Sequence, residues 1–216
     1  MKGYRVTRPR IRAIAAAVIL LVTCGPSLAE DIVASWASVK MPPPPPLKSV
    51  KVDAGQTALL LLDFSKATCN PEKRPRCAES LPMVAKLLAD ARSHHASVVY
   101  STVTNGSVED SPATLAAVPG DPVVSGGADK FFNTDLANIL KAKNIRTVIV
   151  AGTIAPGAVL YTASSAALRG FEVVVPVDGM SANDAFSELS TAWVLAHAAV
   201  SVSSHVTLTR SDMISY

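Results

Sequence analysis

The chain has 216 residues, 49% of them hydrophobic and 17% charged, with a formal net charge of +3. Five of the 20 basic residues and none of the 17 acidic ones lie in residues 1–29, which leaves 15 basic and 17 acidic residues in the remainder. The remainder therefore has a net charge of −2, which gives no reason to expect a nucleic-acid partner.

Residues 1–29 form the pattern of a secretory signal peptide. Basic residues precede the apolar run "AIAAAVILLVTC" (13–24), and "SLA" ending at Ala29 offers small residues for cleavage. A transmembrane anchor is the alternative, but a run of about a dozen residues is shorter than the roughly 20 that a spanning helix needs. We therefore expect a periplasmic or secreted protein that has no membrane association after cleavage.

Residues 30–50 are predicted to be a proline-rich linker. "KMPPPPPLKS" contains five consecutive prolines, Pro42 to Pro46. Proline fixes φ and removes a backbone donor, so this run favours a stiff, extended spacer. A ligand for a proline-reading domain is the alternative. The rest of the chain, residues 51–216, has the length of one domain.

Five apolar runs alternate with segments of helical periodicity in this domain. The runs are continuous, which indicates strands buried on both faces and hence a parallel sheet covered by helices. Asn133 can cap one helix, Pro156 suits the first turn of the next, and Gly170 suits its end. The predicted fold class is α/β, a three-layer α/β/α sandwich with a mostly parallel central sheet. Its predicted strands are 57–63, 96–103, 146–152, 171–177 and 205–210, and its predicted helices are 80–95, 133–144, 156–170 and 185–198.

Two cysteines, Cys69 and Cys77, bracket a short segment rich in proline and charge, "ATCNPEKRPRCAES". In an oxidising compartment such a pair is expected to form a disulfide. Free thiols or a reactive cysteine are the alternatives.

Polar residues and a glycine turn follow three of the predicted strands. In open parallel sheets, binding sites lie beyond the carboxyl ends of the strands. This rule selects Asp63 after the first strand, Thr102 to Asn105 after the second, and the turn at Gly152 after the third. We expect them to converge on one crevice at this edge of the sheet. Asp63 is the strongest candidate among them, because an acidic residue that closes an apolar strand is costly to bury unless it is paired or functional.

Three stretches resemble the isochorismatase-like hydrolases, a family of the cysteine hydrolase superfamily that includes nicotinamidases and N-carbamoylsarcosine amidases. They are "TALLLLDF" (57–64), "FFNTDLANILKAKNIRTVIVAG" (131–152) and "GTIAPGAVLYTASSAALRGFEVVVPVDG" (152–179). The resemblance covers most of residues 55–210 and implies a Rossmann-like topology.

Members of that family usually combine an Asp, a Lys and a nucleophilic Cys, with backbone N–H groups near a cis peptide stabilising the oxyanion. The resemblance aligns Asp63 with the Asp. It aligns the Cys with Ala158, whose methyl group is not a nucleophile, and the Lys with Ser125. The nearest lysine, Lys130, enters the crevice only if the backbone runs differently there, and a surface lysine is the other interpretation.

True isochorismatases also have a small residue in place of the Cys and cleave a vinyl ether, with the Asp as general acid. The resemblance therefore implies a hydrolase without a thiol, in which Asp63 and Lys130 are catalytic. The remaining expected site residues bind substrate or the oxyanion: Thr153, Gly157, Ala158 and Tyr161. A catalytically inactive small-molecule binding protein is the alternative.

No cofactor is expected. The "D-x-H" metal-ligand pattern of nicotinamidases does not occur in "YSTVTNGS", so no metal is expected either. The expected partner is a small-molecule substrate or ligand, and a homo-oligomer is possible because this fold often assembles through its helices.

Overall fold

The computed structural model describes residues 2–3 and 31–216. The expected signal peptide, except for residues 2–3, lies outside the described residues. The chain divides into two compact units, Met1–Pro42 and Pro43–Tyr216. Within the described residues, no helix is both long and apolar enough to cross a membrane.

The first unit contains, in its described part, the short helix α1 (Ile32–Ser35) and a 3-10 turn (Trp36–Ser38). Asp31 caps α1 by accepting a hydrogen bond from the N–H of Val33 at 3.2 Å.

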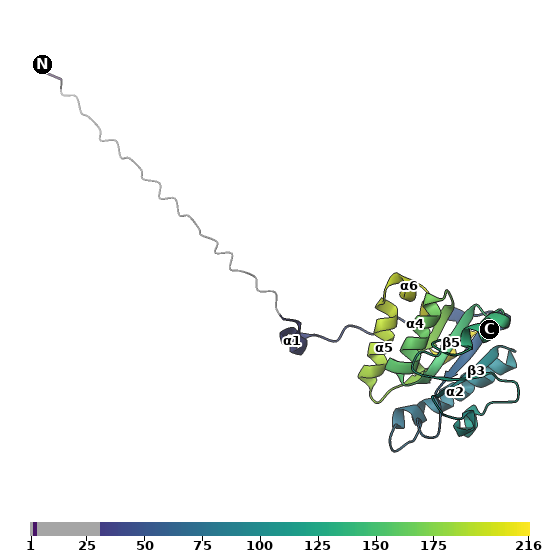
Figure 1. Cartoon of the computed structure of the whole chain (residues 1–216). Coiled ribbons are helices and arrows are strands. Elements are labelled where there is room, and N and C mark those ends of the chain that lie inside the picture. The colour runs from purple at the N-terminus through teal and green to yellow at the C-terminus, as the bar shows by residue number, and fades with distance from the viewer. Residues whose placement is uncertain (1, 4–30) are drawn as a thin grey trace. The chain divides into compact units, whose positions relative to one another are not determined.

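The second unit is built on a parallel sheet, of which β3 and β5 are labelled in Figure 1. Its strand order is β4-β3-β2-β5-β6-β8, and β7 pairs with the end of β5. Its pairings place Leu62 of β2 opposite Ser101 of β3 and Gly152 of β5. The carboxyl ends of the three central strands therefore lie side by side. The strands are β2 (Thr57–Leu62), β3 (Ser97–Val103), β4 (Val123–Gly126), β5 (Thr147–Thr153), β6 (Glu172–Pro176), β7 (Met180–Ser181) and β8 (Val206–Thr209).

Helices cover both faces of this sheet, and the central strand shows how the sequence divides between them. In β2, Leu60 and Leu62 pack into one core, while Leu59 and Leu61 pack into the other, as the two-residue period of a strand requires. The first core includes α3 (Leu136–Ala142), α4 (Leu160–Leu168) and α5 (Ala185–His197), and the second includes α2 (Pro75–Ser93). The predicted three-layer α/β/α fold is confirmed.

Several element boundaries differ from the prediction. The short edge strand β4 was not predicted, because four residues with one buried side chain give too weak an apolar signal. The helix expected at 80–95 begins at Pro75, since proline suits the first position of a helix. Asn133 does not cap α3. It has a φ of 55°, and Asp135 occupies the N-cap position without a side-chain cap hydrogen bond.

The end of the proline run, from Pro43 onward, belongs to the second unit. Pro45 is buried, and the N–H of Lys48 donates to the carbonyl of Leu208 at 3.0 Å. The chain then forms β1 (Val50–Lys51), which pairs in parallel with β9 (Ile214–Ser215) near the C-terminus.

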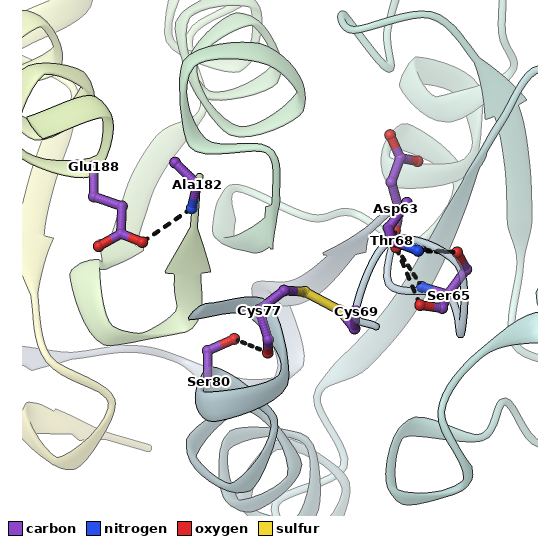
Figure 2. The surroundings of a disulfide bond; sticks show 8 residues. All are labelled: Asp63, Ser65, Thr68, Cys69, Cys77, Ser80, Ala182 and Glu188. Carbon is purple, nitrogen blue, oxygen red and sulfur yellow. Dashed lines mark hydrogen bonds between the residues drawn. A yellow bond between two sulfur atoms is a disulfide. The ribbon is translucent and has the colours of Figure 1, made fainter. Parts of the chain in front are cut away.

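Cys69 and Cys77 form the expected disulfide, with their Cα atoms 4.8 Å apart. Figure 2 shows that it joins the loop after Asp63 to the first turn of α2, where the hydroxyl of Ser80 donates to the carbonyl of Cys77. The disulfide therefore fixes the loop beside the carboxyl end of β2 to the helix that follows it.

Candidate active site

A cavity of about 430 Å³ opens at the carboxyl edge of the sheet. Its wall combines residues that follow β2, β3, β4 and β5, so the strand ends selected from the sequence do meet at one place. The lining residues are Asp63, Thr68, Arg74, Val103, Thr104, Gly126, Gly127, Ala128, Thr153, Ile154, Gly157 and Ala158.

Asp63 directly follows β2 in the left-handed backbone region, with a φ of 58°. Aspartate tolerates this conformation better than most residues do. Its N–H donates to the carbonyl of Ser101 at 3.2 Å, and its carbonyl accepts from the hydroxyl of Thr68 at 2.6 Å. The side chain turns away from the disulfide (Figure 2) and is 8% exposed.

Lys130 forms an ion pair with Asp63. Its Nζ lies 2.8 Å from Oδ1 of the carboxylate, and the lysine side chain is completely buried. The same Nζ donates to the carbonyls of Thr102 at 3.2 Å and Gly126 at 3.1 Å. A buried ammonium group needs such partners, because desolvation without them is very costly. Lys130 is therefore not a surface lysine: it is buried beside Asp63, and it is not itself among the residues that line the cavity.

The backbone of Lys130 is anchored to α4. Its N–H donates to the hydroxyl of Thr162 at 3.1 Å. Ser125, the position that the resemblance aligned with the lysine, is exposed, and its hydroxyl donates to the carbonyl of Val103 at 3.1 Å.

The loop after β5 also contributes to the wall of the cavity. The Thr153–Ile154 peptide is cis, and a π-helical turn (Ala155–Val159) then leads into α4. The N–H of Gly157 donates to the carbonyl of Ile154 at 3.0 Å, so it is already engaged within the loop. Ala158 lines the cavity and is 4% exposed.

The other two expected site residues have different surroundings. The hydroxyl of Thr153 is buried in the cavity wall and has no hydrogen-bond partner among the described residues. Tyr161 is 55% exposed and is not among the residues that line the cavity.

Three polar residues of this site did not stand out in the sequence. The hydroxyl of Ser101 donates to Oδ1 of Asp63 at 2.8 Å, and Thr68 closes the turn beneath that residue. Arg74, at the N-cap of α2, also lines the cavity. Proline at position 75 was the available signal, since it marks a helix start and hence places Arg74 directly before α2.

Metal ligands do not gather at this edge of the sheet. Over residues 2–3 and 31–216, no group of three or more His, Cys, Asp or Glu side chains is arranged to hold a metal ion. His94, at the end of α2, instead pairs its Nδ1 with the carbonyl of Asp90 at 2.8 Å.

Solved structures of similar fold include several hydrolases. The cysteine hydrolase from Pseudomonas syringae pv. phaseolicola 1448A is 20% identical over 78% of this chain and 94% of its own, with a TM-score of 0.65. The N-carbamoylsarcosine amidase from Thermoplasma acidophilum is 20% identical over 73% of this chain and 97% of its own, with a TM-score of 0.62. The nicotinamidase SaPncA from Staphylococcus aureus is 18% identical over 66% and 93%, with a TM-score of 0.60.

No curated protein sequence matches the chain. The sequence model of the isochorismatase domain does match, over residues 57–206, which is more than half of the chain and spans every strand end that lines the cavity. The chain therefore belongs to the isochorismatase family.

Proposed function

We propose that the protein is an exported hydrolase that acts without a thiol nucleophile on a small carbonyl or enol-ether compound, with Asp63 as its general acid or base. The observation that carries this proposal is the buried ion pair between Asp63, which lines the cavity, and Lys130 behind it. Burying a charge at a strand end costs several kcal/mol of desolvation for each ion. A working site is one reason for a protein to retain such a pair.

The contacts of Asp63 leave one carboxylate oxygen for chemistry. Both Lys130 and Ser101 contact Oδ1, and among the described residues Oδ2 has no hydrogen-bond or ion-pair partner. With a carbonyl substrate, Oδ2 would take a proton from the water that attacks the carbon, and would give that proton to the leaving group as the tetrahedral intermediate collapses. With a vinyl ether, a protonated carboxyl would give its proton to the vinyl carbon, and water would add to the resulting oxocarbenium carbon and return a proton to Oδ2. The hemiketal formed in this way would then break its C–O bond and release a ketone and an alcohol.

Ala158 lines the same cavity as Asp63. The methyl group leaves room for water or substrate where the family resemblance places a sulfur atom. Because the N–H of Gly157 already binds the carbonyl of Ile154, we assign the oxyanion contact to the N–H of Ala158. Thr153 supplies a hydroxyl that has no competing partner among the described residues.

Export is the second part of the proposal. The Cys69–Cys77 disulfide suits an oxidising compartment such as the periplasm or the cell exterior. The intact mass of the protein recovered from the periplasm or the medium tests this, and we expect a chain that begins after Ala29. A full-length chain retained in the cytoplasm would contradict export.

A substrate screen tests the catalytic part. Small amides, esters and vinyl ethers are incubated with the mature protein, and each turnover is compared with that of Asp63→Asn. Asp178→Asn is the matched control, because Asp178 also follows a strand but binds Ser211 and does not line the cavity. We expect turnover to fall at least about 100-fold in Asp63→Asn only. Ligand binding that needs Asp63, without turnover of any compound, would instead identify a binding protein.

A further inference from the structure

Arg74 is the second ionisable side chain in the wall of the cavity, beside Asp63. Lys130 neutralises Asp63 at 2.8 Å. Among the described residues, Arg74 takes part in no ion pair, although Arg76, two residues further on, pairs with Glu188. Because Lys130 already pairs with Asp63, the guanidinium group of Arg74 is the charged group of the cavity wall that remains available to a ligand.

The backbone of Arg74 is held in place from both sides. Its N–H donates to the carbonyl of Asn70 at 2.7 Å, and its carbonyl accepts from the N–H of Cys77 at 3.1 Å in the first turn of α2. The disulfide between Cys69 and Cys77 closes the same loop, beside Asp63 (Figure 2). Because the backbone of this loop is already fixed, less conformational entropy is lost in ordering the loop when Arg74 binds a ligand.

A second group in the same wall also lacks a partner. The hydroxyl of Thr153 is buried, and no atom of the described residues completes its hydrogen bonding. Buried hydroxyl groups are normally satisfied, so this one is suited to a polar atom of a ligand. An unpaired guanidinium and an unpartnered hydroxyl in one cavity fit a small molecule that carries an anionic group.

We propose that Arg74 is a specificity-determining residue that binds a carboxylate of the substrate, in addition to the carbonyl or enol ether that reacts near Asp63. This inference rests on the proposed function of the same cavity. A guanidinium group is suited to the role because its planar donors match both oxygens of a carboxylate. The cysteine pair contributes by holding the loop that presents Arg74.

Matched pairs of small ligands test this assignment. Calorimetry measures the binding of malonamate, succinamate and glutaramate, each with one carboxylate and one amide, and of the three neutral diamides of the same lengths. We expect the wild-type protein to bind at least one anionic member about tenfold or more tightly than its diamide, and less tightly as salt is added. Arg74→Gln should remove this preference, and Arg74→Lys should retain part of it.

Lys73→Gln is the control, because Lys73 is exposed, carries the same charge and does not line the cavity. An equal loss of preference in Lys73→Gln and Arg74→Gln would overturn the assignment, as would a wild-type protein without preference at any of the three lengths. Asp63→Asn is titrated in parallel. Its anion preference should persist while its turnover is lost, so that failure of the catalytic proposal and failure of this one give different results.

Discussion

Nζ of Lys130 lies 2.8 Å from Oδ1 of Asp63, and neither side chain is more than 8% exposed. Removing one partner of a buried ion pair leaves the other charge without compensation. Asp63→Asn and Lys130→Met should therefore each lower the free energy of unfolding by about 3–5 kcal/mol. The double variant should lose clearly less than the sum of the two, and urea unfolding of all four proteins measures this coupling. Additive losses would show that the pair does not interact.

Ala158→Cys is expected to create amidase activity. Ala158 lines the cavity together with Asp63, and a thiol at this position would be close to a carboxylate that can accept its proton. The measurement is ammonia release from small primary amides, with Ala158→Ser as the control for added volume and polarity. If Ala158→Cys is folded and reacts with a thiol reagent but releases no ammonia, the cavity lacks the geometry for thiol catalysis.

Gly152→Ala should destabilise the protein. A Cβ atom at this position would lie 2.5 Å from Cβ and 2.9 Å from the carbonyl oxygen of Leu62 on the neighbouring strand. The central strands would have to separate, so we expect a loss of about 1–3 kcal/mol or more in the free energy of unfolding. Gly127→Ala is the control, because a Cβ there has no neighbour within 4 Å. Equal thermal midpoints for the two variants would disprove the close approach of β2 and β5.

The disulfide should contribute to stability through the loop that it closes. For a sequence separation of 8 residues, the loss of loop entropy in the unfolded chain predicts about 2–3 kcal/mol. The Cys69→Ala/Cys77→Ala variant should lose this amount in urea unfolding. Alkylation of the wild-type protein without reductant should modify neither cysteine, and modification of both would contradict the bond.

Tyr216 gives the protein a pH-dependent stability in the alkaline range. Burial, reinforced by the negative charge of Asp90, raises the pKa of Tyr216 to about 12. The unfolded chain ionises near pH 10, so this stabilisation is complete below about pH 10 and is lost as the pH rises toward 12. Unfolding free energies of the wild type and Tyr216→Phe should converge or cross over that interval. Parallel pH profiles would show that Tyr216 ionises normally.

The sequence revealed the parts of this protein that depend on local patterns. Continuous apolar runs predicted the parallel sheet, and an acidic residue after one of those runs identified Asp63. The spacing of Cys69 and Cys77 predicted their bond. These signals are carried by a few neighbouring residues, so they can be interpreted without knowledge of the remaining chain.

The rest of the site depends on tertiary contacts. Lys130 reaches Asp63 because Thr162 of α4 anchors its backbone, a contact across 32 positions that no local pattern reports. Ser101 binds the same carboxylate from the neighbouring strand. Arg74 was missed because the start of α2 was expected at residue 80, which left Arg74 in a solvent-exposed loop.

The account depends on the claim that the Asp63–Lys130 pair is part of a catalytic centre. Its most direct test is the turnover of the best substrate from the screen by Asp63→Asn/Lys130→Met, a variant that removes both charges and leaves neither one buried alone. With its fold verified by circular dichroism, we predict that this variant loses at least about 100-fold in kcat/KM. A folded double variant that keeps wild-type turnover would contradict the claim.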